Sequence, residues 1–144
     1  MIGYVKAGLP RPGWWRGMTI VREIMSVELV TVDPSVNLME AAHAMSVGGV
    51  GSVLVFEDGS LIGIFTERDI LRALAAYPKA DSARTSSVSK GMTREPVTIG
   101  PDASVGEALD LMLSRGFRHL PVMEDDIVVG VVSMRDLAKS LAKE

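Results

Sequence analysis

Residues 63–69 (GIFTERD) and 130–136 (GVVSMRD) are two versions of one pattern, 67 positions apart. Each has a glycine, two apolar residues, a hydroxyl residue, two variable positions and an aspartate. The same shift of 67 positions aligns Met25 with Met92, Pro34 with Pro101 and Met45 with Met112 without a gap. Such self-similarity indicates two copies of one supersecondary unit.

Each copy predicts the order β-α-β-β-α in about 50 residues, which is a mixed α/β (α+β) fold. Apolar residues recur at helical spacing in each copy, first at Leu38, Ala41, Ala42 and Met45. Asp33 before Pro34 is a plausible N-cap for this helix, and Gly48-Gly49 and Gly116 are expected to end the helices. Apolar runs predict strands at 29–32, 52–56, 61–65, 97–99, 119–123 and 127–132, and further helices near Thr66 and Ser133.

A unit of about 50 residues buries too little apolar surface to be stable alone. We therefore expect the two repeats to pack sheet to sheet as one pseudo-twofold pair. The expected division is an N-terminal arm at 1–18, repeat one at 19–77, a linker at 78–87 and repeat two at 88–144. The arm holds Trp14 and Trp15, which we expect to pack on the body or on a second subunit because two exposed tryptophans are unusual.

Composition excludes several classes of protein. There is no cysteine among the 144 residues, which excludes a disulfide framework, a thiolate metal site and a cysteine nucleophile. No apolar run approaches the roughly 18 residues that a membrane span needs, and no signal peptide is recognisable. The net charge of -3 disfavours general nucleic-acid binding, although arginine exceeds lysine. We expect a cytoplasmic protein with no membrane partner.

The sequence offers no catalytic constellation. His43 lies within the first predicted helix and His119 opens a strand, and no serine is placed against a histidine and an aspartate as in a hydrolase. No group of histidines and carboxylates has metal-ligand spacing, and the acidic turns at 57–58 and 124–126 are read as solvated hairpin tips. We therefore expect no enzyme activity and no metal.

The two Gly-x-x-Thr/Ser-x-x-Asp segments have two interpretations. A hydroxyl residue at an N-cap with an acid three residues later resembles a capping box, in which the acid closes the start of a helix. The same arrangement brings a hydroxyl, free backbone N–H groups and a carboxylate to one helix N-terminus. A carboxylate can accept both hydroxyls of a ribose, and a helix N-terminus can bind phosphate. The residues alone leave both interpretations open.

These features occur in the same order in both copies, and together they resemble the tandem cystathionine-β-synthase-type (CBS) repeat. The resemblance covers about 120 residues, from roughly Val21 to Leu141. The resemblance rests on the Met25-Ser26 and Met92-Thr93 starts, on segments 30–34 (VTVDP) and 97–101 (VTIGP), and on 119–122 (HLPV). It implies a stand-alone regulatory or sensor module that binds an adenosine nucleotide (AMP, ADP or ATP, with AMP the leading candidate) in the cleft between the two repeats.

The resemblance also implies roles for individual residues. Ribose would be held by Thr66 with Asp69 and by Ser133 with Asp136. Base contacts would come from the first strand of the neighbouring repeat and from the strand before each motif, namely Val27, Ile64, Arg94, Pro96 and Val131. Phosphate would be held by Arg118, His119 and Arg135 at the Thr66/Asp69 site, and by Arg68 alone at the Ser133/Asp136 site. We therefore expect a phosphorylated adenosine to prefer the first site.

Family members commonly assemble as dimers through their helices, which implies a homodimer here. Two other functions remain open from the sequence: a purely structural dimerisation module without ligand, and a sensor of S-adenosylmethionine. No enzyme, transporter or DNA-binding segment is recognisable beside the repeats, so the module is expected to act on a separate, unidentified protein.

Overall fold

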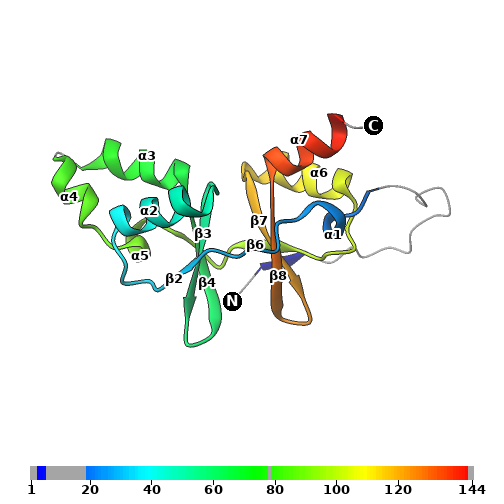
Figure 1. The fold of residues 1–144 in the computed structure, drawn as a ribbon, viewed down its shortest axis with the longest axis horizontal. Helices are drawn as coiled ribbons and strands as arrows, with labels where there is room; N and C mark the ends of the chain where they lie inside the picture. Colours follow the sequence, from blue (N-terminus) through cyan, green and yellow to red (C-terminus); the bar gives the residue numbers. More distant parts are fainter. Residues whose placement is uncertain (1–2, 6–18, 78, 143–144) are drawn as a thin grey trace. The chain divides into compact units, whose positions relative to one another are not determined.

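A computed structural model describes residues 3–5, 19–77 and 79–142 of the chain (Figure 1). The chain divides into two compact units. Unit 1 is built on Leu29–Pro96, and unit 2 combines Gly3–Glu28 with Val97–Glu144. The expected contacts of Trp14 and Trp15 lie outside the described residues.

Unit 1 contains a four-stranded sheet in the order β2-β3-β4-β5. The long hairpin is antiparallel and turns at Asp58-Gly59, where both residues have positive φ (50° and 78°), as a tight hairpin turn requires. The core gathers apolar side chains of α2, β3 and β4 around Phe65. The elements are β2 (Thr31–Val32), α2 (Leu38–Gly48), β3 (Ser52–Glu57), β4 (Ser60–Thr66), α3 (Glu67–Ala76), α4 (Ala80–Arg84), α5 (Val88–Gly91) and β5 (Thr93–Arg94).

Unit 2 contains a four-stranded sheet in the order β1-β6-β7-β8. Its antiparallel hairpin turns at Asp125-Asp126, and its core includes the fully buried Val21, Leu120 and Leu137. The elements are β1 (Gly3–Val5), α1 (Val21–Ile24), β6 (Val97–Ile99), α6 (Val105–Arg115), β7 (His119–Glu124), β8 (Ile127–Ser133) and α7 (Met134–Ala142).

The expected β-α-β-β-α order is confirmed in both repeats, as β2-α2-β3-β4-α3 and as β6-α6-β7-β8-α7. The mixed α/β fold class is confirmed with it. Gly49 and Gly116 end α2 and α6 in the left-handed conformation (φ 65° and 73°), which glycine adopts without a steric penalty. The sheet-to-sheet packing of the two repeats stays a prediction.

One local expectation was wrong. Asp33 does not cap α2: its carboxylate accepts from the backbone N–H and the hydroxyl of Ser35, which lowers the pKa of Asp33 and makes a local turn. The cap of α2 is Asn37, whose side chain accepts from the Glu40 N–H. The segment 78–87, expected as a linker, contains the short helix α4, whose Ala83 is fully buried.

The short segments that precede the repeats have exchanged places. Helix α1, which leads into repeat one, packs on α7 and β8 of unit 2, and Figure 1 shows it in blue beside the yellow-to-red elements. Helix α5 and strand β5, which lead into repeat two, pack on α3 and β4 of unit 1. A repeat in the sequence is therefore not a compact unit in space. Strand β1, which pairs parallel to β6, was not expected from the sequence.

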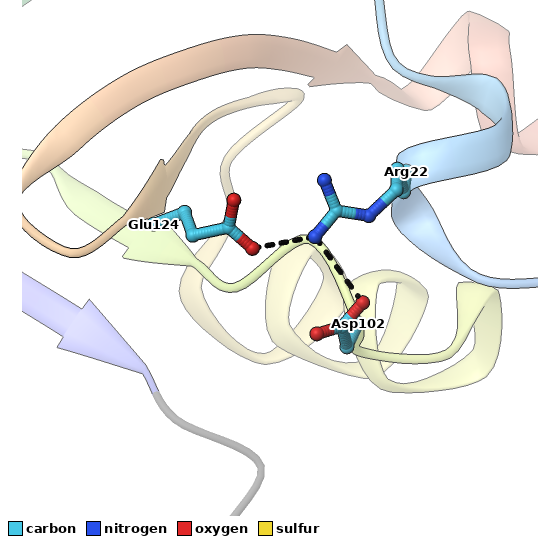
Figure 2. Close-up of polar contacts among 3 residues, drawn as sticks. All are labelled: Arg22, Asp102 and Glu124. Carbon is cyan, nitrogen blue, oxygen red and sulfur yellow. Dashed lines mark hydrogen bonds and ion pairs between the residues drawn. The ribbon is translucent and has the colours of Figure 1, made fainter.

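An ion network on the surface of unit 2 holds α1 in place (Figure 2). The Arg22 guanidinium donates to carboxylate oxygens of Glu124 and Asp102, the second at 3.4 Å. These contacts, led by the hydrogen bond to Glu124, raise the pKa of Arg22. Because all three side chains are well exposed, the burial of the neighbouring Val21 is the larger contribution to the docking of α1.

The exchanged segments approach the hairpins closely at two equivalent glycines. A Cβ on Gly63 would lie 2.5 Å from Met92 Sδ and 3.0 Å from the carbonyl oxygen of Thr93. A Cβ on Gly130 would lie 2.6 Å from Met25 Sδ and 2.9 Å from the carbonyl oxygen of Ser26. The methionine side chains can move, but the backbone oxygens belong to paired segments and cannot move without breaking the pairing.

We predict that Gly63→Ala and Gly130→Ala each lower the free energy of unfolding by about 1–3 kcal/mol, the usual cost of overpacking. The measurement is urea denaturation followed by circular dichroism. The control is Gly106→Ala in α6, where the nearest atom to a new Cβ is Ser104 Oγ at 3.7 Å, so that stability is kept or slightly raised. Unchanged midpoints for Gly63→Ala and Gly130→Ala would contradict the close approach.

Candidate functional site

The first candidate site lies where β4 ends and α3 begins. The backbone N–H and the hydroxyl of Thr66 donate to Asp69 Oδ2 at 2.9 and 3.1 Å, and the backbone N–H of Asp69 lies 3.4 Å from Thr66 Oγ1. These contacts make a complete capping box. Asp69 is buried, with 6% of its surface exposed.

The second candidate site repeats this geometry where β8 ends and α7 begins. The backbone N–H of Ser133 donates to Asp136 Oδ2 at 2.9 Å, and the backbone N–H of Asp136 donates to Ser133 Oγ at 3.1 Å. The capping interpretation of both motifs is therefore confirmed. The caps use only Oδ2 of Asp69 and of Asp136. Because a carboxylate can accept hydrogen bonds at both oxygens, Oδ1 of each residue is not used by its cap.

Arg72 is a neighbour of the first site that the sequence analysis missed. Its guanidinium forms an ion pair with Asp69 Oδ1 at 3.7 Å, from one turn further along α3. The i,i+3 spacing of Asp69 and Arg72 was the signal that could have revealed it. Since the Arg72 side chain is 69% exposed, the pair is weak and a ligand hydroxyl can compete for Oδ1.

In unit 1, the exchanged strand β5 brings further predicted residues to this motif. Ile64 pairs with Thr93, and Gly63 pairs with Arg94, in the antiparallel register of β4 and β5. Pro96 is buried, and the Arg94 guanidinium donates to the carbonyl oxygen of Ser89 at 3.3 Å. Unit 1 thus contains five of the predicted ribose and base contacts: Ile64, Thr66, Asp69, Arg94 and Pro96.

Unit 2 contains the matching set. Ser26 and Val131 exchange two backbone hydrogen bonds, at 2.9 and 3.0 Å, which places the segment of Val27 beside β8. Val27 is 68% exposed, so its side chain is available to a ligand. The predicted residues in this unit are Val27, Val131, Ser133 and Asp136.

The predicted phosphate residues divide between the units. Arg118, His119 and Arg135 belong to unit 2, where His119 pairs with Ser133 across β7 and β8. Arg68 belongs to unit 1 and is exposed on the first turn of α3. Two expected groupings join residues of both units and therefore stay predictions. They are Arg118, His119 and Arg135 with Asp69, and Arg68 with Asp136.

His43 is exposed on α2. Within residues 3–5, 19–77 and 79–142, no group of three or more histidines and carboxylates is arranged to hold a metal ion. None of the helices in those same ranges has both the length and the apolar character needed to cross a membrane.

Comparison with known proteins assigns the family. The CBS domain model matches the chain twice, at residues 21–76 and 86–143, so the chain belongs to the CBS domain family. An uncharacterised 17.7 kDa protein from Acidianus ambivalens is 39% identical over 125 residues, which cover 85% of this chain and 73% of the relative. Pairs of CBS repeats are typically regulatory modules.

Two solved structures share the fold. The CBS-domain protein ATU1752 from Agrobacterium tumefaciens has a TM-score of 0.80 and 32% identity, covering 85% of this chain and 99% of that one. The CBS domain pair of protein MJ0100 has a TM-score of 0.78 and 26% identity, covering 88% and 98%. The MJ0100 pair was solved in complex with 5-methylthioadenosine and S-adenosyl-L-methionine.

We predict that Thr66→Ala and Ser133→Ala each lower the free energy of unfolding by about 1 kcal/mol, because each removes an N-cap oxygen. Urea denaturation without any ligand measures the effect. Ser114→Ala is the control, since its hydroxyl is exposed and bonds only to the Leu111 carbonyl within α6. Loss no greater than in the control would mean that the caps contribute nothing to stability.

Proposed function

We propose that this chain is a regulatory module that binds an adenosine-containing ligand, with AMP as the leading candidate. The observation that carries the proposal is the convergence, within each unit, of the Thr/Ser-x-x-Asp motif with the exchanged segment beside it. At one helix N-terminus this supplies a carboxylate for a ribose and an apolar strand for a base. The MJ0100 pair, which shares the fold at 26% identity, binds two ligands that contain adenosine.

The ribose interaction follows from the acceptor capacity of the carboxylates. Asp69 Oδ2 is occupied by Thr66, and Oδ1 faces only the weak ion pair with Arg72. The two hydroxyls of a ribose diol can each donate a hydrogen bond, one to Asp69 Oδ1 and the other to the remaining lone pair of Thr66 Oγ1. Hydrogen bonds to an ionised acceptor are the strong class, so the loss of this carboxylate should weaken binding severely.

We further propose that the two sites differ in their affinity for phosphate. The Thr66/Asp69 site is assigned Arg118, His119 and Arg135 by the family pattern, whereas the Ser133/Asp136 site is assigned Arg68 alone. Arginine suits phosphate because its planar fork donates two parallel hydrogen bonds. AMP should therefore prefer the Thr66/Asp69 site, whereas a ligand without phosphate should not distinguish the sites on this basis.

A thermal-shift panel of AMP, ADP, ATP, GTP, S-adenosylmethionine and NAD tests the proposal. A ligand at about 100 times its Kd adds roughly 2.7 kcal/mol to the free energy of unfolding. For a chain of this size we expect the Tm to rise by roughly 5–10 °C with AMP. Asp69→Ala should abolish most of this shift and Asp136→Ala should preserve most of it.

Two results would count against the proposal in different ways. The absence of a shift with every adenosine compound would reject the binding function itself. An equal loss in Asp69→Ala and Asp136→Ala would reject only the difference between the sites. A larger shift with S-adenosylmethionine than with AMP would favour a sensor of that compound, the function suggested by the MJ0100 complex.

A structural module without ligand is the second candidate, favoured by the complete capping box at Thr66 and Asp69. Asp69→Glu separates the two functions. Glutamate is the usual acid of a capping box, so the free energy of unfolding should be kept. The longer side chain displaces the carboxylate, so AMP binding should be lost. Retention of both stability and AMP binding would contradict the ribose role of Asp69.

We also propose that the chain forms a homodimer through its helices. In unit 1, α3 exposes Leu71 and Leu74 and α2 exposes Val47, with 68%, 44% and 74% of their surface accessible. Exposed large apolar side chains on neighbouring helices are a common sign of an interface.

We predict that the double substitution Leu71→Glu with Leu74→Glu halves the molar mass measured by light scattering after size exclusion. A buried, unpaired carboxylate at an interface opposes association. Ile127→Glu is the control, because Ile127 is 64% exposed, which is close to the exposure of Leu71, but lies at the hairpin of unit 2. A dimer that persists in the double variant would place the interface elsewhere.

A further inference from the structure

Unit 1 contains a cavity that has only Asp69 in common with the predicted ligand contacts. It has a volume of about 450 Å³ and lies between α3 and the segment that leads into and through α5. This volume falls within the range of small-molecule sites. Its lining residues all belong to unit 1: Leu38, Phe65, Asp69, Arg72, Ala73, Ala76, Tyr77, Ser86, Ser87, Lys90 and Gly91.

Small side chains keep the cavity open. Ala73 and Ala76 line it from α3, one turn apart, and Gly91 lines it from the end of α5. A Cβ on Gly91 would lie 3.2 Å from the ring of Phe65, so any larger residue would crowd this wall. Leu38 and Phe65 are almost completely buried and form an apolar floor.

The polar groups of the cavity are mainly donors. Arg72 and Lys90 are exposed cations, one on each wall, whereas Asp69 is the single carboxylate and already accepts from Thr66. The Tyr77 hydroxyl lies 2.8 Å from Ser86 Oγ, which ties the end of α3 to the segment before α5 and braces the cavity. The lining thus carries one net positive charge above an apolar floor.

From these features we infer a second binding site in unit 1, for a small organic anion. The carboxylate or phosphate of the ligand pairs with Arg72 and Lys90, and its flat apolar body packs over Ala73, Ala76 and Phe65. The site shares Asp69 with the ribose site proposed above but does not depend on that function. Arg72 connects the two, because an anion that draws Arg72 away from Asp69 Oδ1 changes the acceptor available to a ribose.

The equivalent positions of repeat one argue that this site belongs to unit 1 alone. At the shift of 67 residues, Gly91 corresponds to Ile24 and Lys90 to Glu23, in the matching helix α1 of unit 2. Ile24 packs against the core of unit 2, so a large apolar side chain stands there at the position where unit 1 has a glycine. Glu23 puts a negative charge in unit 2 at the position where Lys90 puts a positive charge at the edge of the cavity in unit 1.

Phenyl phosphate and benzoate are suitable probes, and amide chemical shifts in ¹⁵N–¹H spectra report binding to the full chain. We expect saturable shifts at Ala73, Ala76 and Gly91, with none at Gly130. The better binder of the two identifies the anionic group. Inorganic phosphate and benzyl alcohol, which carry only the charge or only the apolar body, should bind at least tenfold more weakly.

The double variant Arg72→Gln with Lys90→Gln should weaken binding of the better probe at least tenfold, and Lys139→Gln, the equivalent of Arg72 in α7, should not. Gly91→Ile should block the probe while its Tm shows that the chain still folds. Unchanged affinity in the double variant would overturn the site. Loss of the AMP thermal shift in Lys90→Gln alone, which leaves the Arg72–Asp69 pair in place, would overturn its independence by making the cavity part of the nucleotide site.

Discussion

The close approach of an exchanged segment to the hairpin of each unit is the constraint on which the rest of the structure depends. Gly63 and Gly130 permit it, because backbone carbonyl oxygens lie where a side chain would otherwise stand. Without this contact, β5 does not pair with β4, and Ser26 does not bond to Val131. The short helices that adjoin these segments would then lose their place over the cores, which include the fully buried Val21 and Val88.

The same constraint explains why structure and binding share one motif. The glycine admits the neighbouring segment, and the hydroxyl residue three positions later caps the start of the next helix together with the aspartate. Those three roles are structural, yet together they place the aspartate carboxylate beside an apolar strand, at the N-terminus of a helix. The capping box and a ribose site are therefore compatible interpretations: the cap orients Asp69 and Asp136 through Oδ2 and leaves Oδ1 for another partner.

The repeat, the order of elements and the helix ends at Gly49 and Gly116 could be predicted because each has a local signal in the sequence. The cap at Asn37 could not, since Asp33 and Pro34 carry the stronger local signal and the turn with Ser35 decides against them. Helix α4 lacks apolar periodicity, so the burial of Ala83 was invisible. The exchange of α1 and α5 depends on tertiary packing, which periodicity does not report. In the site, the motif residues could be predicted, and the i,i+3 spacing of Asp69 and Arg72 was a further local signal, although only the folded unit shows that the two side chains pair.

The two repeats have kept what holds each unit together and have diverged in what lies on its surface. Gly63 and Gly130, Met25 and Met92, and the two capping motifs are retained because each is needed for the close approach or for a helix start. Positions with no such duty differ: Gly91 and Lys90 frame a cavity in unit 1, where Ile24 and Glu23 give unit 2 a filled core and an acidic rim. Duplication thus gives two units with the same fold. A second ligand specificity can arise in one of them at positions that the fold does not constrain.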